Sequence, residues 1–160
     1  MTKAEYPMTR GVRMLRSKKV AFTPHLYPYE EHGGTRHAAD CLEVNERAVI
    51  KTLVMEPDGG KPFLVLMHGD REVSTKNLAR ILGVKSVDPC KPEKAERVTG
   101  YQVGGISPFG TRRPLPVYVE QSILELPRIY INGGKRGFLV GIAPQDLGKG
   151  LDVREVEVGI

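Results

Sequence analysis

Two apolar segments joined by a tight turn constrain the fold of this chain more than any other feature of its sequence. Residues 49–55 are rich in Val, Ile, Leu and Thr, which is typical of a strand because branched side chains fit a pleated surface. Residues 57–60, Pro-Asp-Gly-Gly, predict a turn, and residues 63–67 follow as an entirely apolar partner strand. The sequence therefore predicts a β-hairpin in a strand-rich domain.

Helices and further strands follow at irregular intervals. Ser74 predicts the start of a helix in which Leu78, Ile81 and Leu82 share one face, and Gly83 predicts its end. The other predicted helices are residues 10–19 capped by Thr9, one capped by Thr35 that contains Ala38 and Leu42, and residues 92–98. Extended chain is predicted at residues 22–29, 86–87, 117–120, 128–131 and 138–142, with a turn at residues 132–134. We therefore expect the α+β class, with a mixed sheet curled toward a barrel and helices packed outside it.

The length and composition of the chain indicate one globular domain, residues 1–160. Cores of roughly 100 to 150 residues are the commonest size, and a hydrophobic fraction of 40% argues against disorder. No apolar run approaches the roughly 18 residues of a membrane span, and the first ten residues lack the apolar region of a signal peptide. We therefore expect a cytoplasmic protein with no membrane partner.

The net charge of +5 favours a polyanionic partner, because clustered Lys and Arg attract phosphates over long distances. The two cysteines, Cys41 and Cys90, are far apart in sequence, and neither belongs to a Cys-x-x-Cys pair. We therefore expect no zinc site, no redox site and no cofactor.

Lys51 is the first candidate for chemistry. Alternation along the strand places it on the same face as Val49 and Leu53, which favour burial. One interpretation is a lysine whose side chain snorkels from a strand end to water. The other is a fixed ammonium aimed at a carbonyl, phosphate or ribose oxygen, because lysine carries three donors on a flexible stem.

A second candidate is the loop of residues 100–116, which is rich in Gly and Pro and has no periodicity. The pair Gly104 and Gly105 lets the backbone approach a ligand and point its amides at developing negative charge; the alternative is a tight structural loop. A P-loop is excluded because Thr111 and Arg112 replace the required Lys-Ser/Thr. A covalent serine mechanism is disfavoured, since nothing near Ser107 in sequence would activate it.

A third candidate is the segment of residues 132–137, Asn-Gly-Gly-Lys-Arg-Gly. It is either a hairpin tip or a contact for phosphate or a terminal ribose, through Lys135 and Arg136 with the companion cations Arg112 and Arg113. The histidines have no zinc-protease spacing and are interpreted as structural or solvated; they are His25, His32, His37 and His68.

Together, three motifs resemble the YbaK/EbsC family of aminoacyl-tRNA deacylases. They are Val-Ile-Lys-Thr-Leu at residues 49–53, Gly-Tyr-Gln-Val-Gly-Gly-Ile-Ser-Pro at residues 100–108 and Gly-Gly-Lys-Arg-Gly at residues 133–137. The resemblance extends over residues 14–147. It implies a barrel-like mixed sheet surrounded by helices, shared with the editing domain of bacterial prolyl-tRNA synthetases. It also implies hydrolysis of mischarged tRNA in trans, with Cys-tRNA(Pro) as the YbaK substrate and Ala-tRNA(Pro) as that of a sister branch.

The resemblance also implies roles for individual residues. Lys51 matches the essential lysine and Gly104 the glycine that faces the carbonyl, with the amide of Gly105 beside it as a second oxyanion donor. We expect substrate contacts from Tyr27, Thr52, Ser107, Asn132, Gly133 and Leu139, and tRNA contacts from Arg112, Arg113, Lys135 and Arg136. Three positions depart from the YbaK pattern: Gly34 replaces an aromatic residue, Asn132 a serine and Leu139 an aspartate. These departures predict altered amino-acid selectivity.

The expected partners are aminoacyl-tRNA, tRNA(Pro) first, and prolyl-tRNA synthetase. The attacking group is water or the substrate's own cysteine thiol, and neither route implies a metal. Two alternatives stay open: a non-catalytic module that binds tRNA or a synthetase, and a hydrolase of another small ester or thioester.

Overall fold

The structure is a computed structural model that describes residues 5–160, so residues 1–4 of the expected domain lie outside it. It contains one mixed sheet, which confirms the α+β class. The strands are β1 Thr23–Leu26, β2 Val49–Pro57, β3 Phe63–His68, β4 Val87–Pro89, β5 Val117–Glu120, β6 Ile129–Lys135, β7 Phe138–Ile142 and β8 Val153–Val156. Their order is β1-β7-β6-β2-β3-β5-β8, and β4 pairs with β2. Since β1 and β8 do not pair with each other, the sheet is open and not a closed barrel.

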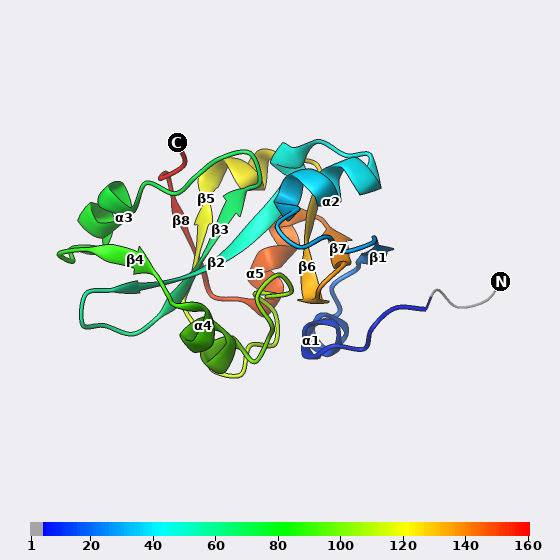
Figure 1. Ribbon diagram of the computed structural model, residues 1–160, viewed down its shortest axis with the longest axis horizontal. Coiled ribbons are helices and arrows are strands. Elements are labelled where there is room, and N and C mark those ends of the chain that lie inside the picture. Colours follow the sequence, from blue (N-terminus) through cyan, green and yellow to red (C-terminus); the bar gives the residue numbers. More distant parts are fainter. Residues whose placement is uncertain (1–4) are drawn as a thin grey trace.

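Helices lie against both faces of the sheet, as Figure 1 shows, with α2 and α3 on one side and α1 and α4 on the other. The helices are α1 Arg10–Ser17, α2 Gly34–Leu42, α3 Thr75–Leu82, α4 Pro92–Thr99 and the short α5 Leu147–Gly150. The caps predicted at Thr9 and Ser74 are confirmed, because each hydroxyl accepts a hydrogen bond from an amide three residues on. Within the described part of the chain, no helix is both long and apolar enough to cross a membrane.

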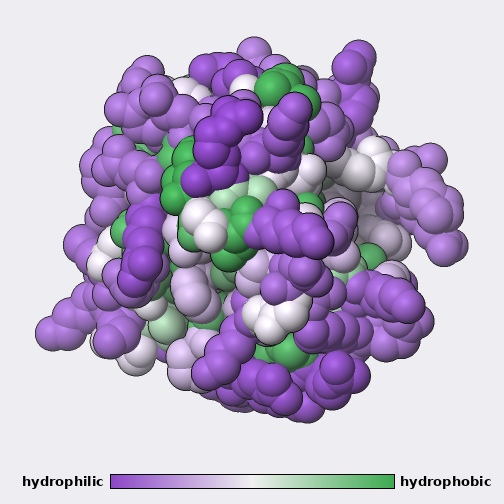
Figure 2. Space-filling model, turned by 90° about the vertical axis from the view of Figure 1, so that its left-hand side faces the viewer, coloured by the Kyte–Doolittle hydropathy of each residue, from purple (hydrophilic) through white to green (hydrophobic). Residues whose placement is uncertain are grey.

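Two helix predictions are wrong in detail. Thr35 lies inside α2 instead of capping it, and its hydroxyl lies 2.8 Å from Glu46 Oε2 and 3.1 Å from the carbonyl oxygen of Gly69. Ile81 of α3 is 54% exposed, because Leu78 and Ala79 form the buried face of that helix. On the side of the molecule that carries α3 and β4, hydrophobic residues form small groups among hydrophilic ones (Figure 2).

The apolar core is divided by the sheet. The larger cluster packs β2, β3, β5, β6 and β7 against α1 and α4, with Phe109 and Phe138 fully buried in it. A second cluster packs the opposite face of β2 and β3 against α3, and a small third one packs Val49 and Leu139 against α2. Because β2 and β3 have apolar neighbours on both faces, β3 reads as a continuous apolar run in the sequence.

The predicted hairpin is confirmed: β2 and β3 pair antiparallel from Ile50–His68 to Met55–Phe63. The turn predicted at residues 132–134 is wrong, because β6 continues to Lys135 and the turn lies at residues 136–137. The pairing of β6 with β7 shifts register between Asn132 and Lys135, which marks a β-bulge. Strand β8 was not predicted; it pairs in parallel with β5 at the edge of the sheet.

Candidate active site

A cavity of about 400 Å³ lies where β2, β6, α2 and the loop of residues 100–116 meet. Segments that are far apart in the sequence converge on it, which makes it the candidate active site. Its wall includes Tyr27, Lys51, Thr52, Gly104, Asn132 and Leu139, all selected from the sequence, together with Gly34.

The cavity lies where the sheet opens beside Thr52. β2 pairs with β6 only over its first two residues, and with β4 only from Met55 onward. The amide of Cys90 donates to the carbonyl of Val54, so the backbone groups of Val54 point to the edge of β2 that faces β4. In a strand, the backbone groups of residues two apart point to the same edge, so the N–H and C=O of Thr52 point there as well. No strand of residues 5–160 pairs there, so both backbone groups of Thr52 face the opening.

The side chain of Thr52 adds a third unused polar group. Its hydroxyl is buried and has no hydrogen-bond partner within residues 5–160. A second hollow of about 350 Å³ continues along the same edge toward β4 and shares Thr52, Leu53, Val103 and Ile106 with the first. Since a buried polar group without a partner is costly, this position is suited to hydrogen bonding a ligand or water.

Lys51 projects from the face of β2 on which Val49 packs against α2 and Leu53 against the α3 cluster. Its side chain is only 18% exposed, and its ammonium donates to the carbonyl of Arg71 and lies 3.6 Å from Glu72 Oε1. This geometry favours the fixed ammonium over a lysine that snorkels into water. Because an ammonium has three N–H donors, one remains for a ligand.

Contacts of Arg136 with Val103 and Tyr29 hold Gly104 at the rim of the cavity. Arg136 Nε donates to the carbonyl of Val103 at 2.8 Å, and its guanidinium lies 5.1 Å from the centre of the Tyr29 ring. Gly104 has a φ of +93°, and a Cβ added to it would lie 2.6 Å from the Tyr29 hydroxyl. The loop can therefore take this path only with glycine at position 104.

The expectation that Gly105 offers its amide to an oxyanion is wrong. That amide donates to the carbonyl of Gln102 at 2.8 Å. The glycine is needed for packing instead, since a Cβ would lie 2.6 Å from the backbone nitrogen of Arg136. The Gly104 amide has no hydrogen-bond partner in the described part of the chain, and is therefore available to a ligand.

Asn132 lines the cavity, but its own amide group is used to build the bulge of β6. Its Oδ1 accepts from the amides of Gly134 at 2.6 Å and Lys135 at 3.1 Å. Its Nδ2 lies 3.3 Å from the carbonyl of Gly104 and 3.2 Å from that of Lys135. Asn132 therefore joins β6 to the glycine loop, and its contribution to the site is to hold that loop.

Three other residues shape the end of the cavity near α2. Leu139 is 4% exposed and packs against Ala38 and Ala39, so this wall is apolar. Burial raises the pKa of Tyr27, with Tyr29 and Cys41 adding to the shift, so its hydroxyl remains a hydrogen-bond donor at neutral pH. A Cβ added to Gly34 would have nothing within 4 Å, which leaves open space where the YbaK pattern has an aromatic ring.

Besides Gly105, Lys135 and Arg136, four of the selected residues do not line this cavity. Ser107 is fully buried, and its hydroxyl accepts from the amide of Phe109 at 3.1 Å. Gly133 packs against the ring of Phe138. The backbone amides of Arg112 and Arg113 donate to carbonyls at the C-terminal end of α4. Arg113 also lines a separate hollow near the β2–β3 turn. For Ser107 and Gly133, packing explains the residue type without a substrate.

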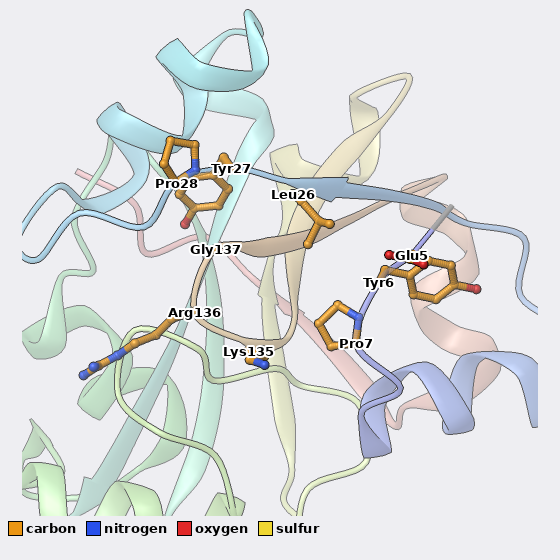
Figure 3. Close-up of a pocket in the computed structure, with 9 residues that line it drawn as sticks. All are labelled: Glu5, Tyr6, Pro7, Leu26, Tyr27, Pro28, Lys135, Arg136 and Gly137. Carbon is orange, nitrogen blue, oxygen red and sulfur yellow. The ribbon is translucent and has the colours of Figure 1, made fainter. Parts of the chain in front are cut away.

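Lys135 and Arg136 border a shallow groove beside the cavity, between β1, the β6–β7 turn and the segment before α1 (Figure 3). The exposed side chain of Leu26 points into it from β1. Tyr27 lines both the groove and the cavity, so the two are adjacent. The remaining wall is Glu5, Tyr6, Pro7, Pro28 and Gly137.

Sequence reasoning missed Tyr29 and His37, which also line the cavity. His37 Nε2 donates to the carbonyl of Pro28 at 2.7 Å, and its Nδ1 lies 3.3 Å from Glu30 Oε2, so it fastens the preceding segment to α2. Tyr29 lies two residues after Tyr27 in an extended segment, a spacing that places both on one side and offered a usable signal. Within residues 5–160, no three His, Cys, Asp or Glu side chains gather at metal-binding distances.

The chain is similar to proteins that are named for the editing or deacylation of aminoacyl-tRNA. A family model described as the aminoacyl-tRNA editing domain matches residues 32–149. EbsC of Enterococcus faecalis, named as a candidate Cys-tRNA(Pro)/Cys-tRNA(Cys) deacylase, is 29% identical over 138 residues, which are 86% of this chain and 84% of that protein.

Two further relatives show where this fold occurs. The proline–tRNA ligase of Moorella thermoacetica is 33% identical over 122 residues, which are 74% of this chain but only 21% of the ligase. A crystal structure described as a candidate trans-editing enzyme for prolyl-tRNA synthetase superposes with a TM-score of 0.83 at 22% identity, covering 98% of this chain and 99% of that one. The fold therefore makes up nearly the whole of one solved protein, whereas the sequence resembles only part of a much longer enzyme.

Proposed function

The chain belongs to the aminoacyl-tRNA editing domain family, and we propose that the cavity beside Thr52 is where it hydrolyses mischarged tRNA(Pro), with Cys-tRNA(Pro) as the first substrate. Deacylation as such follows from the family. The observation that supports this site is the opening of the sheet, beside which Lys51 and Thr52 both line the cavity.

The polar groups of the cavity suit an ester whose carbonyl oxygen becomes negative in the transition state. The unpaired amides of Gly104 and Thr52 act as oxyanion donors in this proposal, with Thr52 taking the role first expected of Gly105. Lys51 contacts the ester or the terminal phosphate. Donors fixed before the reaction stabilise the developing charge without a reorganisation cost, which is the largest catalytic effect in many hydrolases.

The reaction needs no protein nucleophile. Water adds to the ester carbonyl carbon, the bond from that carbon to the ribose oxygen breaks, and the tRNA hydroxyl leaves with a proton as the free amino acid forms. With a cysteinyl ester, the substrate thiol attacks the same carbon instead: the new C–S bond closes a cyclic thioester, the bond from that carbon to the ribose oxygen breaks, and the thiol proton passes to the departing tRNA hydroxyl. The wall around the carbonyl is mainly apolar, so water is partly excluded and the hydrogen bonds to the oxyanion are strengthened.

A deacylation panel tests the proposal. The substrates are tRNA(Pro) carrying Cys, Ala, Ser or Pro, and tRNA(Cys) carrying Cys. Turnover of Cys-tRNA(Pro) with Pro-tRNA(Pro) spared is the expected result. Binding of tRNA without turnover of any ester would instead identify a non-catalytic binding module.

We expect Leu139 to broaden amino-acid selectivity. An apolar wall cannot accept a hydrogen bond from a substrate amino or thiol group, so Ala and Ser esters should be cleaved alongside Cys esters. Leu139→Asp should raise the ratio of Cys to Ala rates about tenfold, because one buried polar pairing contributes about 1 to 3 kcal/mol. Leu139→Asn supplies an acceptor of equal size without the charge, so it shows whether hydrogen bonding alone raises the ratio. A ratio of Cys to Ala rates in Leu139→Asp that is unchanged from the parent would remove Leu139 from selectivity.

The groove beside the cavity is the path we propose for the single-stranded 3′ end of tRNA. Its apolar floor, which includes Leu26 and Pro7, suits bases, and Lys135 has no ion-pair partner among the described residues. The carboxylate of Glu5 also borders the groove and opposes phosphate there. The similarity to part of a proline–tRNA ligase supports prolyl-tRNA synthetase as a transient partner.

Lys135→Glu should weaken tRNA binding and leave the chemical step unchanged. We expect KM to rise about tenfold with kcat unaltered. The slope of log KM against log salt concentration should fall by about one, which corresponds to the loss of one phosphate contact. Lys85→Glu, at an exposed lysine that precedes β4 on the far side of the molecule, is the control with the same charge change. Equal effects from both variants would mean that only net charge matters.

A further inference from the structure

We propose that residues 156–160 position the ammonium of Lys51 for the reaction. The proposal rests on the proposed function, in which Lys51 contacts the substrate. It is carried by a continuous series of contacts from Lys51 to residues 71–74, from these to residues 158–160, and from both to the buried carboxylate of Glu120.

The first contact is the one that Lys51 makes with Arg71. Its ammonium donates to the Arg71 carbonyl, whereas its ionic partner Glu72 has a side chain that is 81% exposed. An exposed carboxylate moves freely and is screened by water, but a backbone carbonyl moves only with the chain. The position of the ammonium therefore depends on where the backbone at Arg71 is held.

The second contact fastens that backbone to residues 158–160. The segment of residues 71–74 lies between β3 and α3, and it pairs antiparallel through the bridge Val73–Gly159. The amide of Glu72 donates to the carbonyl of Ile160 at 3.0 Å, and the amide of Ile160 donates back at 2.8 Å. The amide of Ser74 donates to Val158 at 2.7 Å.

The third contact is a buried carboxylate that joins both segments. Glu120, at the end of β5, is 4% exposed; its Oε1 accepts from the amides of Val158 at 2.7 Å and Gly159 at 3.2 Å. Its Oε2 lies 3.5 Å from Arg71 Nη1, and Arg71 Nη2 donates to the carbonyl of Gly159 at 2.6 Å. The Arg71 guanidinium compensates the buried charge of Glu120, so loss of Arg71 would leave a buried carboxylate without its ionic partner.

Gly159 is the point at which this arrangement is most easily disturbed. A Cβ added there would lie 2.9 Å from Arg71 Cζ and 2.9 Å from Glu120 Oε2. A single methyl group there must therefore displace the side chain of Arg71 or of Glu120. Residues 156–160 also lie beyond the region that matches the editing-domain model, which ends at residue 149, so the shared domain pattern does not describe this device.

The test compares Gly159→Ala with Gly148→Ala. Gly148 has nothing within 4 Å of a Cβ, which makes it the matched control. We expect Gly159→Ala to lower kcat for Cys-tRNA(Pro) about 10- to 100-fold, because displacement of a catalytic group by 1 Å has effects of this size. KM should stay within about twofold. Trace acetylation read by mass spectrometry should show faster labelling of Lys51, with Lys94 unchanged.

A purely structural role for the segment would lower thermal stability without a selective change at Lys51. Parental kcat and parental Lys51 labelling in a folded Gly159→Ala protein would overturn the proposal. If that variant does not fold, Glu120→Gln decides by the same two measurements, because it keeps the acceptor for the amides and loses the charge facing Arg71. Normal turnover by Lys51→Ala would instead reject the role of Lys51 itself.

Discussion

Lys51→Ala should fold and lose nearly all deacylation of Cys-tRNA(Pro). The reason is local: the ammonium is the only cation on the wall formed by β2, and no other lysine or arginine lines the cavity among residues 5–160. Loss of one charged or hydrogen-bonding group that acts in the transition state typically costs about 10² to 10³ in rate. Single-turnover deacylation at saturating enzyme measures the chemical step, and tRNA binding measured separately should change less.

Lys94→Ala is the matched control for that variant. Lys94 is also a half-buried lysine in an ion pair with a residue of β2, Glu56, but it lies outside the cavity. It should keep parental kcat. Lys51→Arg should retain part of the activity, since a guanidinium keeps the charge but not the point-like geometry of an ammonium. Equal rates for Lys51→Ala and Lys94→Ala would exclude Lys51 from the reaction.

The hairpin and the helix caps could be predicted from sequence because their causes are local. Strand β3 is a continuous apolar run, and Ser74 with Gly83 marks both ends of α3. The bulge at Asn132 could not be predicted, because its side chain reaches the Gly104 carbonyl from a segment far away in the sequence. Asn-Gly-Gly is a strong turn signal, and here the same conformational freedom builds a bulge.

The candidate site was predictable to the extent that single residue types reveal it. Lys51 stood out as a charge among apolar neighbours, and Gly104 as one of a glycine pair. The polar groups of Thr52 were not recognisable, because they are free only where β6 leaves β2 and before β4 begins. Glu120 and Arg71 were missed for a similar reason: both are ordinary surface residue types, and Glu120 becomes a buried partner of Arg71 only where residues 158–160 contact both side chains.

Gly104→Val should lower the rate of deacylation about 10² to 10³-fold, the usual effect of losing one oxyanion donor. Two physical causes act together. Valine disfavours the φ of +93° at this position, and its side chain would collide with the Tyr29 hydroxyl, 2.6 Å from the Cβ position, and with Arg136 Nε at 3.2 Å. The contact between Arg136 and Tyr29 that holds the loop must then be lost, and the amide of residue 104 turns away from the cavity.

Gly59→Val is the control for backbone strain alone, because it shares the disfavoured positive φ but not the collision with neighbouring side chains. Gly59 also has a positive φ, +68°, but nothing lies within 4 Å of its Cβ and it sits in the turn between β2 and β3, away from the cavity. We expect this control to lose thermal stability and keep parental kcat, whereas Gly104→Val loses kcat even at temperatures where it is fully folded. The oxyanion assignment also requires tRNA affinity to survive in Gly104→Val. Parental deacylation by that variant, or an equal loss of kcat in both, would show that the Gly104 amide does not face the reacting carbonyl.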